Sequence, residues 1–208
     1  MKPIKKLLAI RLSALGDICM TLPVIDSFCR AYPEVDVMFL TSKQGAAIAR
    51  SVLHHENLHF YPINKRDYSG IAGLNRLYKE MRALGFDAVA DLHSVLRTQW
   101  LDLRFKLAGK NVKVIAKGRK DKKKLVGHQK LQQLKTGVER YQEVFEALEF
   151  KFDVDYRGAD HRLDSTAKLY SLGIAPFAQH KGKIYPIEQM SEVVEKLIAE
   201  RPDLHIYL

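Results

Sequence analysis

The chain has 208 residues, a length that fits one large domain or one domain and part of a second. Hydrophobic residues make up 47% and charged residues 28%, and this balance excludes a disordered or collagen-like chain. The 34 Lys and Arg residues outnumber the 24 Asp and Glu residues, so the formal net charge is +10, which favours anionic partners.

Apolar stretches alternate with stretches of helical periodicity along the first part of the chain. The predicted strands are residues 6–12, 35–40, 58–63, 86–92 and 111–116. The predicted helices are residues 17–32 (interrupted at Pro23), 43–53, 70–84, 95–107 and 136–148. One face of the helix at 70–84 carries Ile71, Leu74, Leu77, Tyr78, Met81 and Leu84. Strands separated by such helices predict βαβ crossovers and a parallel sheet covered on both faces.

The composition changes near residue 150, where we place the end of a first domain, residues 1–150. Residues 151–167 carry charges and show no periodicity, so we predict a linker there. Residues 168–208 predict one βαβ unit that begins a second domain of the same type. Because units of about 40 residues rarely fold without staples, we expect an incomplete chain that is inactive alone and belongs to a longer two-domain protein.

The first segment that could carry chemistry lies at the carboxyl end of the first predicted strand and reads Arg11-Leu12-Ser13-Ala14-Leu15-Gly16-Asp17. Ligands of open α/β sheets bind at the carboxyl ends of the strands, where this segment lies. Gly16 would permit a positive φ and a close backbone approach to a ligand. Asp17 could serve a reaction there, or it could merely cap the next helix, where Asp is favoured. The residues alone favour the cap.

Two further polar segments lie at the same predicted edge of the sheet. His93 ends a strand and Arg97 follows one helical turn later, although such residues are usually solvated. Residues 117–124 hold six cations, and we expect a solvated loop that can bind anions. Its candidate binding residues are Arg119, Lys120, Lys122, Lys123 and Lys124. No aromatic residue is interleaved with these cations, so base stacking is disfavoured.

A fourth segment, residues 175–186, joins a strand of the second domain to its helix. Lys183 there could hold a phosphate beside the exposed N–H groups of the helix start, or it could be an ordinary solvated lysine. The sequence carries no motif for several other chemistries. The chain lacks a dinucleotide fingerprint, a P-loop, a hydrolase nucleophile elbow and Cys or His pairs at metal-binding spacing.

These segments together resemble glycosyltransferase family 9, the ADP-heptose:lipopolysaccharide heptosyltransferases. The match rests on residues 10–18 with the Thr21-Leu22-Pro23 that follows, on residues 91–97 and on residues 178–186. Two departures lie on the donor side. Tyr185 stands where the family usually has Trp, and Pro176-Phe177-Ala178 replaces the usual Pro-Gly-Ala.

The resemblance implies an α/β, GT-B-like architecture, in which two Rossmann-like domains face each other across a cleft. It implies an inverting transfer of heptose from a nucleotide-sugar, ADP-heptose, to the lipopolysaccharide inner core, with Asp17 as the catalytic base and no metal or other cofactor. It assigns acceptor binding to the first domain, for which our candidates are Ser13, Ala14, Leu15, Gly16, His93, Arg97, Arg119, Lys120, Lys122, Lys123 and Lys124. It assigns donor phosphate binding to the second domain, for which our candidates are Gln179 and Lys183.

The chain is expected to be cytoplasmic and to meet its acceptor at the inner face of the cytoplasmic membrane. Its apolar N-terminal stretch is too short for a signal peptide, and no apolar run reaches the roughly 18 residues of a membrane-spanning helix. Cys19 and Cys29 lie about 15 Å apart on one predicted helix, too far for a disulfide. We also expect a monomer.

Two other functions fit parts of the sequence. A non-catalytic module that binds anions or nucleic acid would explain the net charge and the basic run, but it has no use for the segment that ends in Asp17. An NAD-dependent oxidoreductase is disfavoured by the missing glycine fingerprint. We therefore expect no nucleic-acid partner.

Overall fold

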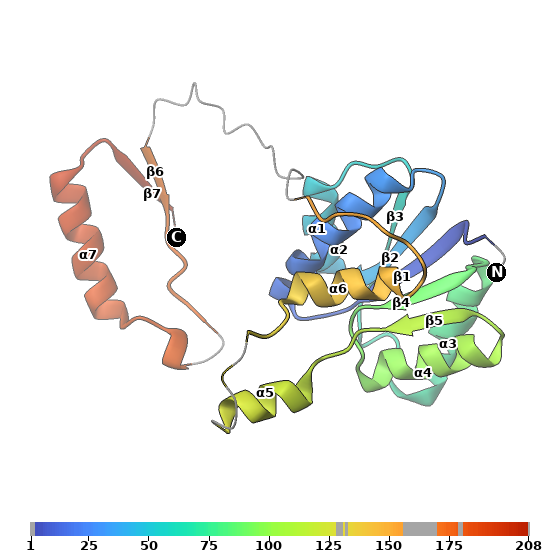
Figure 1. Cartoon of the computed structure of the whole chain (residues 1–208). Coiled ribbons are helices and arrows are strands. Elements are labelled where there is room, and N and C mark those ends of the chain that lie inside the picture. The colour runs from blue at the N-terminus through green and yellow to red at the C-terminus, as the bar shows by residue number, and fades with distance from the viewer. Residues whose placement is uncertain (1–2, 128–130, 132, 156–169, 179–180, 208) are drawn as a thin grey trace. The chain divides into compact units, whose positions relative to one another are not determined.

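The computed structural model of the chain describes residues 3–127, 131, 133–155, 170–178 and 181–207. It divides into two compact units, Met1–Ala159 and Asp160–Leu208, and each is described by itself (Figure 1). The strands are β1 (Lys6–Arg11), β2 (Asp36–Ser42), β3 (Leu58–Ile63), β4 (Ala88–Asp91), β5 (Asn111–Val114), β6 (Tyr170–Gly173) and β7 (Leu204–Tyr207). The helices are α1 (Leu15–Ala31), α2 (Lys43–Val52), α3 (Gly70–Ala83), α4 (Leu96–Leu107), α5 (Arg119–Val126), α6 (Gly137–Glu146) and α7 (Ile187–Glu200), with a short 3₁₀ helix η2 (Lys181–Lys183).

The first unit is built on a five-stranded parallel sheet in the order β3-β2-β1-β4-β5. The first strand, β1, lies in the middle, and its Leu7 pairs with Val37 of β2 on one side and Ala88 of β4 on the other. Strand order reverses at β1, so the loops after β1 and β4 diverge to opposite faces and open a crevice at their carboxyl ends. This topology places the segments at residues 13–17 and 93–97 next to each other.

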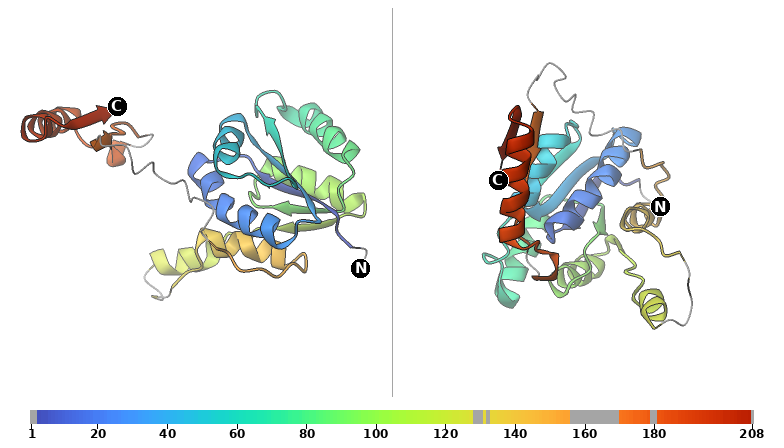
Figure 2. Two further views of the ribbon diagram at one scale, coloured as in Figure 1. Left: turned by 90° about the horizontal axis from the view of Figure 1, so that it is seen from above. Right: turned by 90° about the vertical axis from the view of Figure 1, so that its left-hand side faces the viewer.

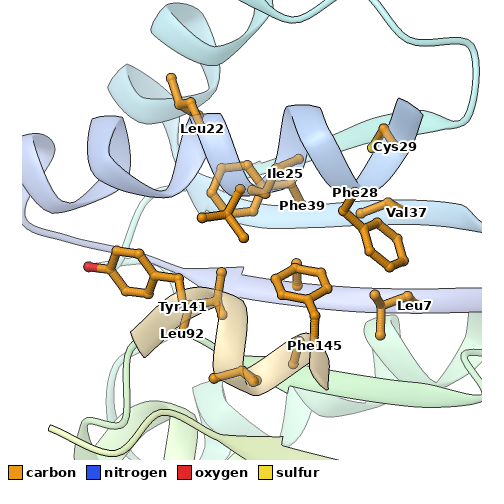
Figure 3. Packing of buried hydrophobic residues seen from close by; sticks show 14 of the residues in the cluster. Leu7, Leu22, Ile25, Phe28, Cys29, Val37, Phe39, Leu92, Tyr141 and Phe145 are labelled. Atoms are coloured by element: carbon orange, nitrogen blue, oxygen red, sulfur yellow. The ribbon is translucent and has the colours of Figure 1, made fainter. Parts of the chain in front are cut away.

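Helices cover both faces of this sheet, as Figure 1 and the two views of Figure 2 show. Side chains alternate along β1, so that Leu7 and Ala9 face one core and Leu8 and Ile10 face the other. The first core is closed by α1, α2 and α6, and the second by α3 and α4. In Figure 3, Phe28 from α1 and Phe145 from α6 meet over the strands, with their ring centroids 4.8 Å apart.

Two helices differ in detail from the sequence prediction. Helix α1 is not interrupted at Pro23 but continues to Ala31, because Val24, Ile25 and Phe28 are fully buried against the sheet and hold the helix in place. In α3 the buried face is formed by Gly73, Leu77, Tyr78 and Met81. Ile71, in the first turn, is 67% exposed, and Leu84, beyond the last turn, is also exposed.

The segment after residue 150, predicted to be a linker, begins instead as part of the first unit. Phe150 and Phe152 pack against Phe28, with ring centroids at 4.9 and 5.6 Å. The backbone N–H of Asp155 donates to Ser27 Oγ, and that hydroxyl donates to the Asp155 carbonyl. Two aromatic residues in a charged stretch were enough to attach this segment, and the first unit accordingly extends to Ala159.

The second unit pairs β6 with β7 in parallel, and α7 connects them. An apolar hollow of about 390 Å³ lies between the loop after β6 and α7, lined by Phe177, Ile187, Met190 and Val194 among others. Within the described part of the chain, no helix is long and apolar enough to cross a membrane.

Candidate functional site at the carboxyl ends of β1 and β4

Asp17 lies in the first turn of α1, immediately after the loop that leaves β1. Its Oδ2 accepts a hydrogen bond from the backbone N–H of Ala14, at 3.3 Å, so Asp17 caps the helix from its third position, and not from the N-cap position that the sequence favoured. Its side chain is nevertheless 53% exposed, so a ligand can reach the carboxylate. The capping interpretation and the catalytic one are therefore compatible, since one oxygen caps the helix and the other is left over.

Arg11, the last residue of β1, forms an ion pair with the same carboxylate. One guanidinium nitrogen lies 2.5 Å from Asp17 Oδ2, and another donates to the carbonyl of Leu92 at 2.6 Å. The guanidinium also lies over the ring of Tyr141, 5.6 Å from its centroid. Arg11 is only 6% exposed. Its contacts connect the ends of β1 and β4 with α1 and α6. Arg11 lies in the segment that the sequence singles out, but it was not among the predicted site residues, although a cation at the end of an apolar strand is an available signal.

Gly16 has a different part from the one predicted. It lies inside the first turn of α1 and is not among the residues with positive φ. A Cβ built on it would meet no atom within 4 Å. Gly16 therefore contributes open space beside Asp17 rather than a special backbone conformation. The exposed side chain of Leu15 lies next to it in the sequence.

His93 is buried, not solvated, and it joins the loop after β4 to the loop after β1. Its Nε2 lies 3.3 Å from Ser13 Oγ, and its backbone N–H donates to Asp91 Oδ1 at 2.8 Å. Burial, reinforced by the positive charge of Arg11, lowers the pKa of His93 to about 4. The imidazole is therefore neutral at neutral pH and can exchange a hydrogen bond with the hydroxyl of Ser13.

A second carboxyl group, Asp102 of α4, lies beside Asp91 beneath this loop. Asp91 is fully buried and accepts hydrogen bonds from the N–H groups of His93 and Ser94. Burial and the adjacent charge of Asp91 raise the pKa of Asp102 to about 8. Asp102 is thus largely protonated at neutral pH and can donate a hydrogen bond to Asp91.

This pair makes stability depend on pH. Between pH 4 and 8 the folded state keeps a proton on Asp102 that the unfolded state releases, so the free energy of unfolding falls as the pH rises. We expect Asp102→Asn, which keeps a donor toward Asp91, to lose less thermal stability than the wild type between pH 6.5 and 8.5. His93 acts in the opposite direction near pH 6.5, where the unfolded imidazole still binds part of a proton that the folded state lacks, but it does so equally in the variant and the wild type and cancels from the comparison. Equal losses in the variant and the wild type, measured by thermal unfolding at the two pH values, would contradict the raised pKa of Asp102.

The basic run forms a helix, α5, rather than the predicted loop. None of its side chains is buried, and Arg119, Lys120, Lys122, Lys123 and Lys124 all remain exposed. The helix begins after Gly118, whose φ is +58° and whose missing Cβ leaves room for the Arg140 guanidinium. Lys and Arg have good helix propensity, and Asp121 in the first turn favours the helix further, which a charge count alone does not reveal.

Only some of the cations at residues 117–124 line a pocket of about 460 Å³. Lys117, Arg119 and Lys120 line it together with Ser94 and Gln99, whereas the three lysines at 122–124 do not. The ammonium of Lys117 donates to the carbonyl of Ser94 at 2.8 Å. Burial and the positive charges of Arg119 and Arg11 lower the pKa of Lys117, while the negative charges of Asp91 and Asp17 act in the opposite direction.

The remaining candidates are placed as follows. Arg97 donates to the carbonyl of Tyr68 and so fixes the loop between β3 and α3. That loop also carries Lys65, an exposed cation that the sequence analysis missed and whose charge helps lower the pKa of His93. In the second unit, Lys183 ends η2 and is exposed before the start of α7. Gln179 lies outside the described residues.

The acidic and imidazole side chains near this site raise the question of a metal ion. Among the residues that the structure describes, no group of three or more His, Cys, Asp or Glu side chains is placed to hold a metal ion. The carboxylates that do come together, Asp91 and Asp102, are buried, and Asp102 is largely protonated.

Comparison with known proteins identifies relatives. No protein-family model matches the chain. A lipopolysaccharide core heptosyltransferase of Haemophilus influenzae, OpsX, is 28% identical over 102 residues, which is 49% of this chain and 28% of that protein. The chain therefore corresponds to well under two thirds of that relative's length.

Solved structures share the fold. Escherichia coli heptosyltransferase WaaC, in complex with ADP-2-deoxy-2-fluoro heptose, matches 98% of this chain and 76% of its own with a TM-score of 0.65 at 18% identity. A glycosyl transferase family 9 protein of Veillonella parvula matches 93% of this chain and 60% of its own with a TM-score of 0.66 at 18% identity. The predicted α/β, GT-B-like fold is thereby confirmed, and the nucleic-acid-binding alternative gains no support. The chain is thus similar in sequence to the heptosyltransferase OpsX over about half of its length, and it shares the fold of WaaC and of the Veillonella glycosyl transferase family 9 protein.

Proposed function

We propose that the protein is an inverting glycosyltransferase that moves heptose from ADP-heptose to the lipopolysaccharide inner core. The observation that carries this proposal is the Asp17 carboxylate, exposed at the carboxyl edge of the sheet yet held by buried Arg11, in a chain related to heptosyltransferases. A merely structural helix cap does not need a buried guanidinium beneath it.

On the acceptor side, Asp17 acts as the general base. A hydroxyl of the acceptor gives its proton to the carboxylate while its oxygen attacks the anomeric carbon of the donor. The bond between that carbon and the diphosphate oxygen breaks, its electron pair leaves with ADP, and the anomeric configuration inverts. The open space beside Gly16 admits the acceptor, and the neighbouring cations Lys65, Lys117 and Arg119 attract its anionic groups.

On the donor side, the diphosphate that leaves needs positive charge. Lys183 precedes α7, whose first turn presents unpaired backbone N–H groups, and these two features suit a phosphate. Such a cationic site neutralises the departing ADP without a divalent metal, and we propose that none is required. We further propose that Gln179 assists Lys183, that the enzyme is a monomer in the cytoplasm, and that it works at the inner face of the cytoplasmic membrane.

A donor screen with the complete gene product tests this function. The protein is incubated with ADP-heptose, with UDP- and GDP-sugars, and with purified lipopolysaccharide core acceptors, and products are read by mass spectrometry. We expect the acceptor mass to rise by one heptose with ADP-heptose, and Asp17→Asn to abolish the gain. Transfer from another donor would change the sugar assigned, and no transfer from any donor would refute the enzyme.

The three lysines outside the pocket give a separate prediction. Replacing Lys122, Lys123 and Lys124 with Gln should raise the KM for a phosphorylated acceptor several-fold and flatten its dependence on salt, because exposed charges act over a screening length of about 8–10 Å. Glu192, Glu195 and Lys196 of α7 offer a control, since replacing them with Gln changes exposed charges in the other unit. An unchanged KM and salt response would leave these lysines as a solvated helix face.

A further inference from the structure

We infer that Arg11 is a positioning residue for Asp17, which fixes the carboxylate so that Oδ1 is the oxygen that takes the acceptor's proton. This inference rests on the proposed function and assigns a role within that same site. Two donors, the Arg11 guanidinium and the Ala14 N–H, both bind Oδ2. In the part of the chain that the structure describes, no hydrogen bond is made to Oδ1, so it is the oxygen free for a ligand.

The Arg11 guanidinium can fix the orientation of the Asp17 carboxylate as well as supply positive charge. A guanidinium presents its N–H groups in a rigid fork, and here separate nitrogens bind the Leu92 carbonyl and the Asp17 carboxylate. The Leu92 carbonyl belongs to the chain leaving β4, which is paired with β1 in the sheet. The fork therefore transfers the rigidity of two central strands to a side chain that is half exposed.

The burial of Arg11 supports the same role. A cation removed from water is costly unless it is paired, and among the described residues the ionic partner of Arg11 is Asp17. Its Nε has no hydrogen-bond partner, and the ring of Tyr141 covers the guanidinium at 5.6 Å. If Asp17 served only as a helix cap, an apolar side chain could replace the buried Arg11. Orienting the Asp17 carboxylate requires the two directed N–H groups of the guanidinium.

The test is a double-mutant cycle in the complete protein with the donor and acceptor identified above. Arg11→Met should lower kcat at least about 10-fold, because small misplacements of a reacting group are expensive, while both KM values stay within about 2-fold. Arg11→Lys, which can reach only one of the two acceptors at a time, should recover part of kcat. In the Asp17→Asn background, Arg11→Met should cost nothing further, since the residue it positions is already inactive.

The outcomes separate this inference from the function on which it rests. An additive loss in the double variant, an unchanged kcat, or a higher KM with unchanged kcat would overturn the positioning role while leaving the transferase intact. If the wild type transfers no sugar, crystal structures of the wild type and Arg11→Met decide. Displacement of the Asp17 carboxylate in the variant supports the role, and an unmoved carboxylate refutes it. Should Arg11→Met fail to fold, Arg11→Lys supplies the same comparisons.

Discussion

Asp17→Asn should lower kcat at least about 100-fold, because removing a general base typically costs 10²–10⁴-fold. The amide has the shape of the carboxylate, and its oxygen can still accept from Arg11 and Ala14, so the first turn of α1 should survive. It cannot take the proton of the acceptor hydroxyl. The KM for the acceptor should change little. The rate of sugar transfer at saturating donor and acceptor measures the effect.

The matched control is Asp36→Asn. Asp36 is also exposed, but it begins β2 and so lies at the amino edge of the sheet, away from the loops after β1 and β4. We expect its kcat to equal that of the wild type. A near wild-type kcat for Asp17→Asn would reduce Asp17 to a helix cap.

Phe28→Ala should destabilise the first unit by about 3–5 kcal/mol, the usual cost of replacing a buried Phe by Ala. Phe28 is 0% exposed, and its ring makes tilted or edge-to-face contacts with Tyr32, Phe145, Phe150 and Phe152 at centroid distances from 4.8 to 5.6 Å. Its removal leaves a cavity and also loosens the attachment of residues 150–155. Urea unfolding of both proteins measures the difference in the free energy of unfolding.

Leu96→Ala is the control for that measurement. Leu96 is 87% exposed at the start of α4, so its truncation leaves no cavity, and we expect a change within about 0.5 kcal/mol. A loss for Phe28→Ala no larger than that of Leu96→Ala would mean that the aromatic cluster does not hold the unit together.

Much of the fold could be predicted from the order and periodicity of the elements. The strand at residues 58–63 and the helix at 43–53 match β3 and α2 almost residue for residue, because apolar alternation and helical periodicity are local signals. Local signals fail where distant residues decide. The residues near Pro23 do not reveal that α1 packs against the sheet. The residues near Phe150 do not reveal that its ring packs against Phe28.

The site divides in the same way. Asp17 could be proposed because it ends a segment that follows a strand and resembles a family motif, and the sheet topology brings His93 beside Ser13 of that segment. Arg11 belongs to the same segment, but its spacing assigned it no role of its own, and the raised pKa of Asp102 depends on a contact between β4 and α4. Such pairings arise from burial in three dimensions, and the spacing along the chain does not encode them.

The central place of β1 has a consequence for synthesis of the protein. Strand β1 leaves the ribosome before β2 and can pair with it soon afterwards, but its other edge waits for Ala88 and the rest of β4. Until then, Leu7, Leu8, Ala9 and Ile10 present an apolar strand with unpaired backbone groups, the kind of edge that associates with other chains. Nascent chains stalled before β4 should therefore be the species that chaperones bind most strongly and that aggregate when chaperones are scarce.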